Sequence, residues 1–295
     1  RERPAHRLPP ATRVGPVRLA IADLGRSLAF YQEILGLRLL ETDGERAILG
    51  AGAGEGPLVV LQQRRDARPV PRPGRLGLYH YAILLPERAA LGRCLLHLHR
   101  SGVRVATADH RVSEALYLSD PDGLGIELYA DRPRSTWGTR PTPAGPELVL
   151  TTEALDLESL GRAAGATEWA GLPGGTVIGH VHLHVGSLPE AAAFYHETLG
   201  LDLTVWSYPG ALFLSAGGYH HHLGLNTWIG PTAEAPRPDE ARLLEWTLLV
   251  PDRAAALEGA GRLRAAGYQV ELRAEDPPLA CDPWGTAVRL DWNGD

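Results

Sequence analysis

The stretch AFYQEILGL, residues 29–37, returns later in the chain as AFYHETLGL, residues 193–201, at an offset of 193 − 29 = 164. A second motif, DPDG at residues 120–123, returns as DPWG at residues 282–285, at nearly the same offset. The chain therefore consists of two related halves. A repeat of this length is a stronger guide to the fold than the local propensities of its residues.

Each half contains two smaller units with the same order of elements. In the first unit an alternating strand at residues 17–21 precedes a helix at residues 24–35, which Gly36 caps. Three short strands separated by turns follow, at residues 38–41, 46–49 and 58–62. The order is βαβββ, and the other three units repeat it.

The unit boundaries follow from this repeat. The predicted bounds are 13–63 and 76–131 in an N-terminal half (13–133), and 178–228 and 243–292 in a C-terminal half (178–295). Residues 134–177, rich in Pro and Gly at their start, are expected to form a linker with a short helix. One curved unit exposes an apolar concave face that a second unit must cover. The sequence therefore predicts an α+β fold in which four βαβββ units pair into two half-barrel cups.

Composition excludes several classes of partner. The 295 residues are 44% hydrophobic and 22% charged, as in ordinary globular proteins. A net charge of −6 argues against nucleic acid or an anionic membrane as partner, and no apolar run reaches the length of about 20 residues that a membrane span needs. The first residues lack the apolar core of a signal peptide, and only Cys94 and Cys281 are present. We expect a cytoplasmic protein, and leave open whether it forms homo-oligomers.

Histidines gather at the start of the third unit. His180, His182 and His184 alternate with apolar residues, so their imidazoles share one face of a strand. The second unit carries His80 on its first strand and Glu127 on its last. Two imidazoles and a carboxylate on one side of an ion suit non-haem Fe(II) or Mn(II), and leave positions open for a chelating substrate and O₂. We therefore predict that His80, Glu127 and His180 are metal ligands.

Four stretches resemble a known family: GLYH (77–80), VSEALYLSDPDG (112–123), YADRPRSTW (129–137) and GGYHHH (217–222). They are similar to the vicinal oxygen chelate superfamily, and within it to the type I extradiol dioxygenases, especially bacterial catechol 2,3-dioxygenases built of two halves. The resemblance covers nearly the whole chain. It implies ring opening of a catechol-type aromatic diol, next to its hydroxyl pair, with Fe(II) and O₂.

The chain departs from this family at the metal ligands. Better-known members hold the metal within the C-terminal half, through a His opening the third unit, a His opening the fourth and a Glu in the final strand. Here His180 keeps the first position, but Glu245 and Arg289 occupy the other two. The missing groups occur in the second unit, as His80 and Glu127. We hypothesise that the second and third units pair around the metal, while the first and fourth form a structural cup.

The resemblance also implies roles for four further residues. His221 or His222, in a run that we place on the last strand of the third unit, handles the substrate's hydroxyl proton. Strand alternation would put His221 on the opposite face from its two neighbours. His110 lies near the substrate ring, and Tyr117 donates a hydrogen bond to a substrate oxygen.

Two other functions are compatible with this fold, because fold alone does not fix function. A glyoxalase-like metal-dependent isomerase or lyase would need a second carboxylate, for which Glu245 is the candidate. A metal-free protein that sequesters a small molecule such as an antibiotic would need no histidine for proton transfer. The number of histidines facing the cup favours the dioxygenase.

Overall fold

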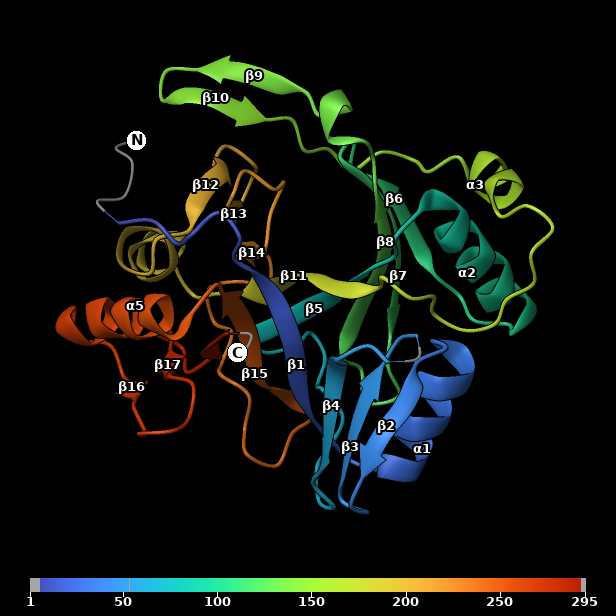
Figure 1. Ribbon diagram of the computed structural model, residues 1–295, viewed down its shortest axis with the longest axis horizontal. Helices are drawn as coiled ribbons and strands as arrows, with labels where there is room; N and C mark the ends of the chain where they lie inside the picture. Colours follow the sequence, from blue (N-terminus) through green and yellow to red (C-terminus); the bar gives the residue numbers. More distant parts are fainter. Residues whose placement is uncertain (1–5, 53, 293–295) are drawn as a thin grey trace.

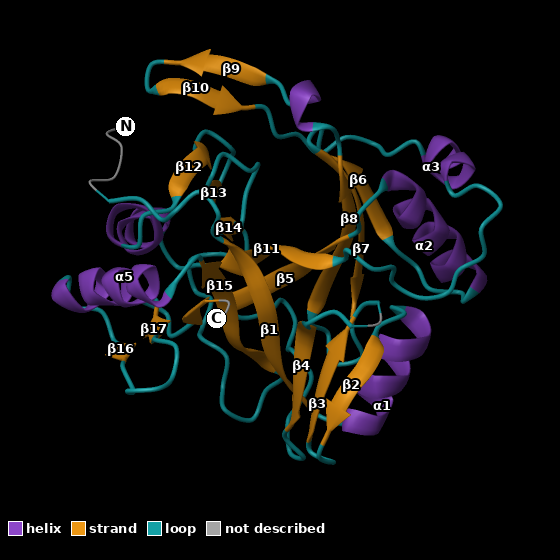
Figure 2. Ribbon diagram, in the orientation of Figure 1, coloured by secondary structure: helices purple, strands orange, loops and turns teal. Residues whose placement is uncertain are grey.

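Two eight-stranded curled sheets dominate the computed structural model, which describes residues 6–52 and 54–292 (Figure 1). Helices occupy the outside of both sheets (Figure 2). Across the described residues, none of the helices is both long and apolar enough to cross a bilayer. Cys94 is a buried free thiol and Cys281 a partly buried one.

The four units each follow the predicted βαβββ order. The first contains β1 (Arg13–Ile21), α1 (Leu24–Ala29), the π-helix η1 (Phe30–Ile34), β2 (Arg38–Thr42), β3 (Arg46–Gly50) and β4 (Pro57–Gln63). The second contains β5 (Gly77–Leu84), α2 (Arg88–Arg100), β6 (Ala106–Asp109), β7 (Ser113–Ser119) and β8 (Gly125–Asp131). The third contains β11 (Val177–His184), α4 (Leu188–Ala192), the π-helix η3 (Ala193–Thr198), β12 (Asp202–Val205), β13 (Ala211–Ser215) and β14 (Leu223–Asn226). The fourth contains β15 (Arg242–Val250), α5 (Arg253–Ala265), β16 (Val270–Glu271), β17 (Leu279–Cys281) and β18 (Ala287–Trp292).

The order of strands shows which units pair. One sheet runs β12-β13-β14-β11-β5-β8-β7-β6, and therefore joins the third unit to the second. The other runs β16-β17-β18-β15-β1-β4-β3-β2, and joins the fourth unit to the first. The seams are the antiparallel pairs β5–β11 and β1–β15. The predicted α+β fold of paired units is confirmed, and each sheet takes one unit from each half.

Within each half, the first repeated motif is hydrogen-bonded to the second. Tyr31, in the first motif, donates a hydrogen bond from its hydroxyl to Asp120 Oδ2, at 3.2 Å, in the second. In the other half Tyr195 donates in the same way to Asp282 Oδ2, at 3.0 Å. All four side chains are buried, and each Asp also accepts N–H groups of its own turn. The motifs recur together because they form one contact.

Two local features differ from the sequence prediction. The helix expected at residues 24–35 is α-helical only to Ala29 and continues as a π-helix, and the third unit repeats this break. The segment between the halves contains η2 (Arg134–Thr136), β9 (Thr139–Thr142), β10 (Gly145–Leu148) and α3 (Leu157–Ala163). The β9–β10 hairpin was not predicted. Buried Glu147 anchors it to the third unit by accepting the backbone N–H groups of Trp206 and Ser207, at 2.6 and 2.7 Å.

Candidate metal centre

Three adjacent strands, β11, β5 and β8, bring the predicted ligands together. The register sets Ala82 of β5 opposite His180 of β11 and beside Glu127 of β8. His80 lies two residues before Ala82 on β5, so it shares that face of the sheet. Because the side chain of Ala82 ends at a methyl group, the three longer side chains meet over it.

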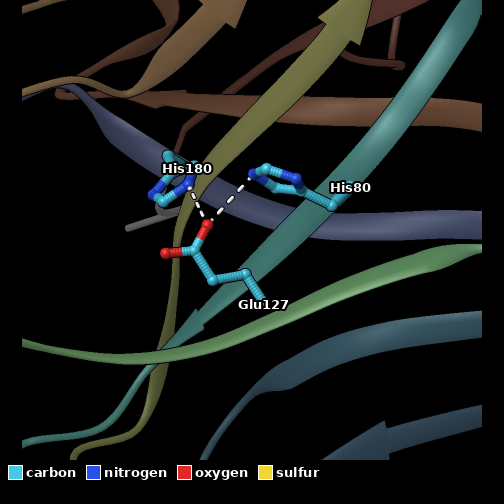
Figure 3. A group of neighbouring side chains, drawn as sticks. All are labelled: His80, Glu127 and His180. Carbon is cyan, nitrogen blue, oxygen red and sulfur yellow. Dashed lines mark hydrogen bonds and ion pairs between the residues drawn. The ribbon is translucent and has the colours of Figure 1, made fainter. Parts of the chain in front are cut away.

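The three side chains converge closely enough to share one ion. Glu127 Oε2 lies 3.0 Å from His80 Nε2 and 3.0 Å from His180 Nε2 (Figure 3). The candidate ligand atoms all lie within 4.8 Å of one another, and the three side chains are buried. The contact between His80 and Glu127 lacks hydrogen-bond geometry, so His80 Nε2 is a buried nitrogen without a hydrogen-bond partner in the described structure. Such a lone pair fits a cation, and this group could hold a metal ion.

The charge states also suit a cation. Burial lowers the pKa of both His80 and His180 below the ordinary value of imidazole, which favours their neutral forms. Burial alone would raise the pKa of Glu127, but the interactions of its carboxylate with His180 and His80 outweigh it and bring that pKa well below its usual range. Neutral imidazoles and an ionised carboxylate are the forms that bind a divalent metal.

The predicted histidine face of β11 is confirmed. His180, His182 and His184 all line one cavity. Asn226 contacts the last two of these histidines. Its Oδ1 is 2.7 Å from His184 Nδ1, and its Nδ2 is 2.9 Å from His182 Nε2. Because an amide nitrogen only donates, His182 Nε2 is the acceptor. The wall of the cavity beside His80 is therefore hydrogen-bonded to Asn226.

Tyr117 and His110 form a pair on the side of Glu127 that faces away from β5. Tyr117 on β7 is the register partner of Glu127, and its hydroxyl lies 2.6 Å from His110 Nε2. His110 Nδ1 lies 2.6 Å from the carbonyl oxygen of Thr151, which only accepts. His110 Nδ1 therefore carries the proton, and Tyr117 donates to Nε2. Both side chains line the cavity, whereas the contact with Thr151 had no signal in the sequence.

The strand placement of His220–His222 was wrong. These residues lie in the loop before β14, after a turn made by Gly217 and Gly218, whose φ angles are +62° and +68°. Left-handed backbone favours glycine, so the chain turns at these two residues, and the ladder hydrogen bonds resume only at His222, which bonds to Leu214 and Val181. Strand alternation therefore does not determine which of these histidines faces the substrate.

The three loop histidines have separate environments. The His221 ring lies 4.1 Å from the His180 ring and lines the cavity. His222 Nδ1 accepts the backbone N–H of Ala216, at 3.1 Å, and among the described residues His222 is not part of the cavity wall. Fully buried His220 bonds to Asp131, a carboxylate that the sequence did not single out.

The cavity over these residues has a volume of about 930 Å³. Three aromatic residues, Tyr208, Phe213 and Trp228, line it. A segment from Pro69 to Arg75, which joins the first two units, also forms part of the wall.

Comparison with known proteins identifies the family. The family model of the Glyoxalase/Bleomycin resistance protein/Dioxygenase superfamily matches residues 13–128 and 177–279. The chain is 45% identical to a catechol-2,3-dioxygenase of Bacillus subtilis (strain 168) over 274 residues, which is 90% of this chain and 94% of that protein. A solved structure of a B. subtilis protein matches with a TM-score of 0.65 at 14% identity, covering 99% of this chain and 87% of that one. Glyoxalase I of Zea mays matches with a TM-score of 0.54 at 18% identity, covering 95% and 92%. The chain therefore belongs to the Glyoxalase/Bleomycin resistance protein/Dioxygenase superfamily.

Proposed function

We propose that this protein is an extradiol dioxygenase that opens a catechol-type aromatic diol with O₂. His80, Glu127 and His180 would hold Fe(II), and the same ligands suit Mn(II). The observation that carries the proposal is the convergence of this group at a cavity that also contains His221, His110 and Tyr117. The 45% identity to a catechol-2,3-dioxygenase over nearly the whole chain supports it.

The residues around the metal have distinct tasks in this proposal. When bound, the metal supplies Lewis-acid chemistry and the redox chemistry of O₂. His221, beside His180, accepts a proton from a substrate hydroxyl. Burial raises the pKa of Tyr117 well above its ordinary value, so its hydroxyl keeps the hydrogen that it donates to His110 Nε2, and its oxygen is left to accept a hydrogen bond from the substrate. His110, bonded to Thr151, holds that hydroxyl in place.

The cavity admits more than an unsubstituted ring. Its volume of about 930 Å³ lies near the upper end of the range of roughly 300–1,000 Å³ typical of ligand sites. Val70, Leu78 and Ile126 give it apolar wall, and Tyr208 and Trp228 offer aromatic faces. The proposed substrates therefore include catechols with ring substituents.

The two alternative functions have less support. An isomerase would need a second carboxylate at the metal, but Glu245 lies on β15 in the other sheet, where it is paired with Arg289. A metal-free sequestering protein would have no use for a buried group of two imidazoles and one carboxylate. The dioxygenase uses all of these groups.

Metal analysis and O₂ uptake test the proposal. Protein purified without oxygen should contain iron or manganese and should consume O₂ when catechol is added, forming a ring-opened product that absorbs visible light. His80→Ala and His180→Ala should each abolish metal binding and O₂ uptake. His99→Ala, which changes an exposed histidine on α2, is the matched control. Wild-type protein that binds metal but gives no ring-opened product from any catechol would contradict the proposal.

A further inference from the structure

A chain of three side chains leads from the cavity to the surface behind His221. His221 Nδ1 lies 2.7 Å from His220 Nδ1, and His220 Nε2 lies 2.9 Å from Asp131 Oδ1. His220 is fully buried, whereas the side chain of Asp131 is 26% exposed. The chain therefore connects a residue of the cavity wall, through a buried imidazole, to a carboxylate at the edge of the protein.

For two neutral imidazoles, the chemistry of the partners decides which nitrogens carry hydrogen. A carboxylate only accepts, so His220 Nε2 carries the hydrogen of the bond to Asp131. In a neutral imidazole the other nitrogen is then an acceptor, so His220 Nδ1 accepts from His221 Nδ1–H. This leaves the lone pair of His221 on Nε2, away from the bond to His220. In the opposite tautomer His221 would offer a hydrogen at Nε2 and could not take a proton there.

Asp131 is itself held in place. It is the last residue of β8, the strand that also carries Glu127. The Tyr219 hydroxyl donates to the same Oδ1, at 3.1 Å, and lies 2.8 Å from the Tyr129 hydroxyl. One strand thus fixes both a candidate metal ligand and the carboxylate that orients the histidine pair.

We propose that Asp131 and His220 are positioning residues that hold His221 in the tautomer whose Nε2 accepts the hydroxyl proton of the substrate. This inference rests on the proposed function, because it names the groups that prepare His221 for that step. When His221 Nε2 takes the proton, Nδ1–H keeps its bond to His220, so the transfer requires no rearrangement within the pair. Asp131 acts through His220 and does not itself contact the cavity.

The tautomer can be measured without reference to activity. In protein loaded with diamagnetic Zn(II) and labelled with ¹⁵N-histidine, long-range ¹H–¹⁵N spectra, assigned by comparison with His221→Gln, should show that His221 is protonated at Nδ1. Asp131→Asn supplies an amide that can donate to His220 Nε2, so it should reverse or mix the His221 tautomer. A wild-type His221 protonated at Nε2, or a tautomer unchanged in Asp131→Asn, overturns the proposal.

Kinetics separate a positioning role from a structural one. Asp131→Asn should lower kcat by about 10- to 100-fold, as loss of a partner that orients a site residue commonly does, with KM and metal content unchanged. Tyr219→Phe removes the other donor to the same Oδ1 but keeps the bond to His220, and should stay within about twofold of wild type. Equal losses in both variants, or none in Asp131→Asn, contradict the proposal. If the wild type opens no catechol ring, the proposed function fails, and the tautomer measurement still decides the state of His221.

Discussion

Arg289 on β18 binds Glu245 on β15 through two contacts, Nη2 to Oε2 at 2.7 Å and Nε to Oε1 at 3.0 Å. In the repeat these residues occupy the positions of Glu127 on β8 and His80 on β5. The register agrees, because Glu245 faces Arg18 across the β1–β15 seam just as His80 faces His182 across the β5–β11 seam. An ion pair thus stands in one sheet where the candidate metal ligands stand in the other.

Removal of this ion pair should affect stability alone. Arg289→Met leaves the largely buried Glu245 carboxylate without its partner, which should lower the free energy of unfolding by about 1–3 kcal/mol. Metal content should not change, since the candidate ligands lie in the other sheet. Urea unfolding and metal analysis measure the two effects. Arg273→Met, at an exposed surface pair, should change stability by less than about 0.5 kcal/mol. Loss of metal from Arg289→Met would show that the two sheets are not independent.

Glu127→Gln should abolish the stabilisation of the folded protein by bound metal. The substitution keeps the size of the side chain but removes the charge that a divalent cation needs. In wild-type protein, chelation should lower the melting temperature, because metal at about 100 times its Kd stabilises the folded state by about 2.7 kcal/mol. In Glu127→Gln the chelator should have no effect. Glu153→Gln, on the surface beside Arg111, should respond as the wild type does. Differential scanning calorimetry with and without chelator measures both responses.

Tyr117→Phe should slow turnover and leave the metal bound. The variant loses the hydroxyl that donates to His110 Nε2, whereas the three candidate ligands stay intact. We expect kcat to fall by about 10- to 100-fold, with metal content as in the wild type. Steady-state O₂ uptake and metal analysis report the two quantities. Tyr268→Phe, which alters a tyrosine packed on Phe194, is the control and should keep full activity. Metal loss in Tyr117→Phe would instead assign the tyrosine a role in ligand binding.

His222 should make metal-free protein sensitive to acid. Burial lowers the pKa of His222 from 6.5 to about 3. As the pH falls, this histidine is protonated in the unfolded chain before it is protonated in the folded protein. The free energy of unfolding is therefore undiminished above pH 6.5 and decreases as the pH falls toward 3. Between pH 7.5 and 5 this amounts to about 2 kcal/mol. His222→Asn, which can still accept from Ala216 N–H, should lose correspondingly less stability over that range. Equal losses in urea titrations of both proteins would contradict the assignment.

Much of the fold could be predicted because its signals are local or repeated. The alternation of apolar residues located most strands, and the offset between copies identified the four units. The pairing of units followed from the family resemblance: the positions that hold the partners of His180 in better-known members are Glu245 and Arg289 here, and the second unit supplies His80 and Glu127 instead. The structure does bring these three side chains together.

The remaining features depend on contacts between distant residues. The β9–β10 hairpin is held by Glu147 against Trp206 and Ser207, and a stretch rich in Pro and Gly gave no sign of it. The loop position of the histidine run depends on two glycines in left-handed conformation, which hydrophobic alternation does not reveal. The bond between Asp131 and His220 joins residues 89 positions apart and had no local signal.

Because β5 pairs with β11, the candidate metal centre takes its ligands from both halves of the chain. Two of its side chains lie before the β9–β10 hairpin and the third lies after it. A polypeptide split in that hairpin would give two fragments, neither of which has enough ligands to retain an ion. If the mixed fragments re-form both sheets, a bound metal ion would link one fragment to the other.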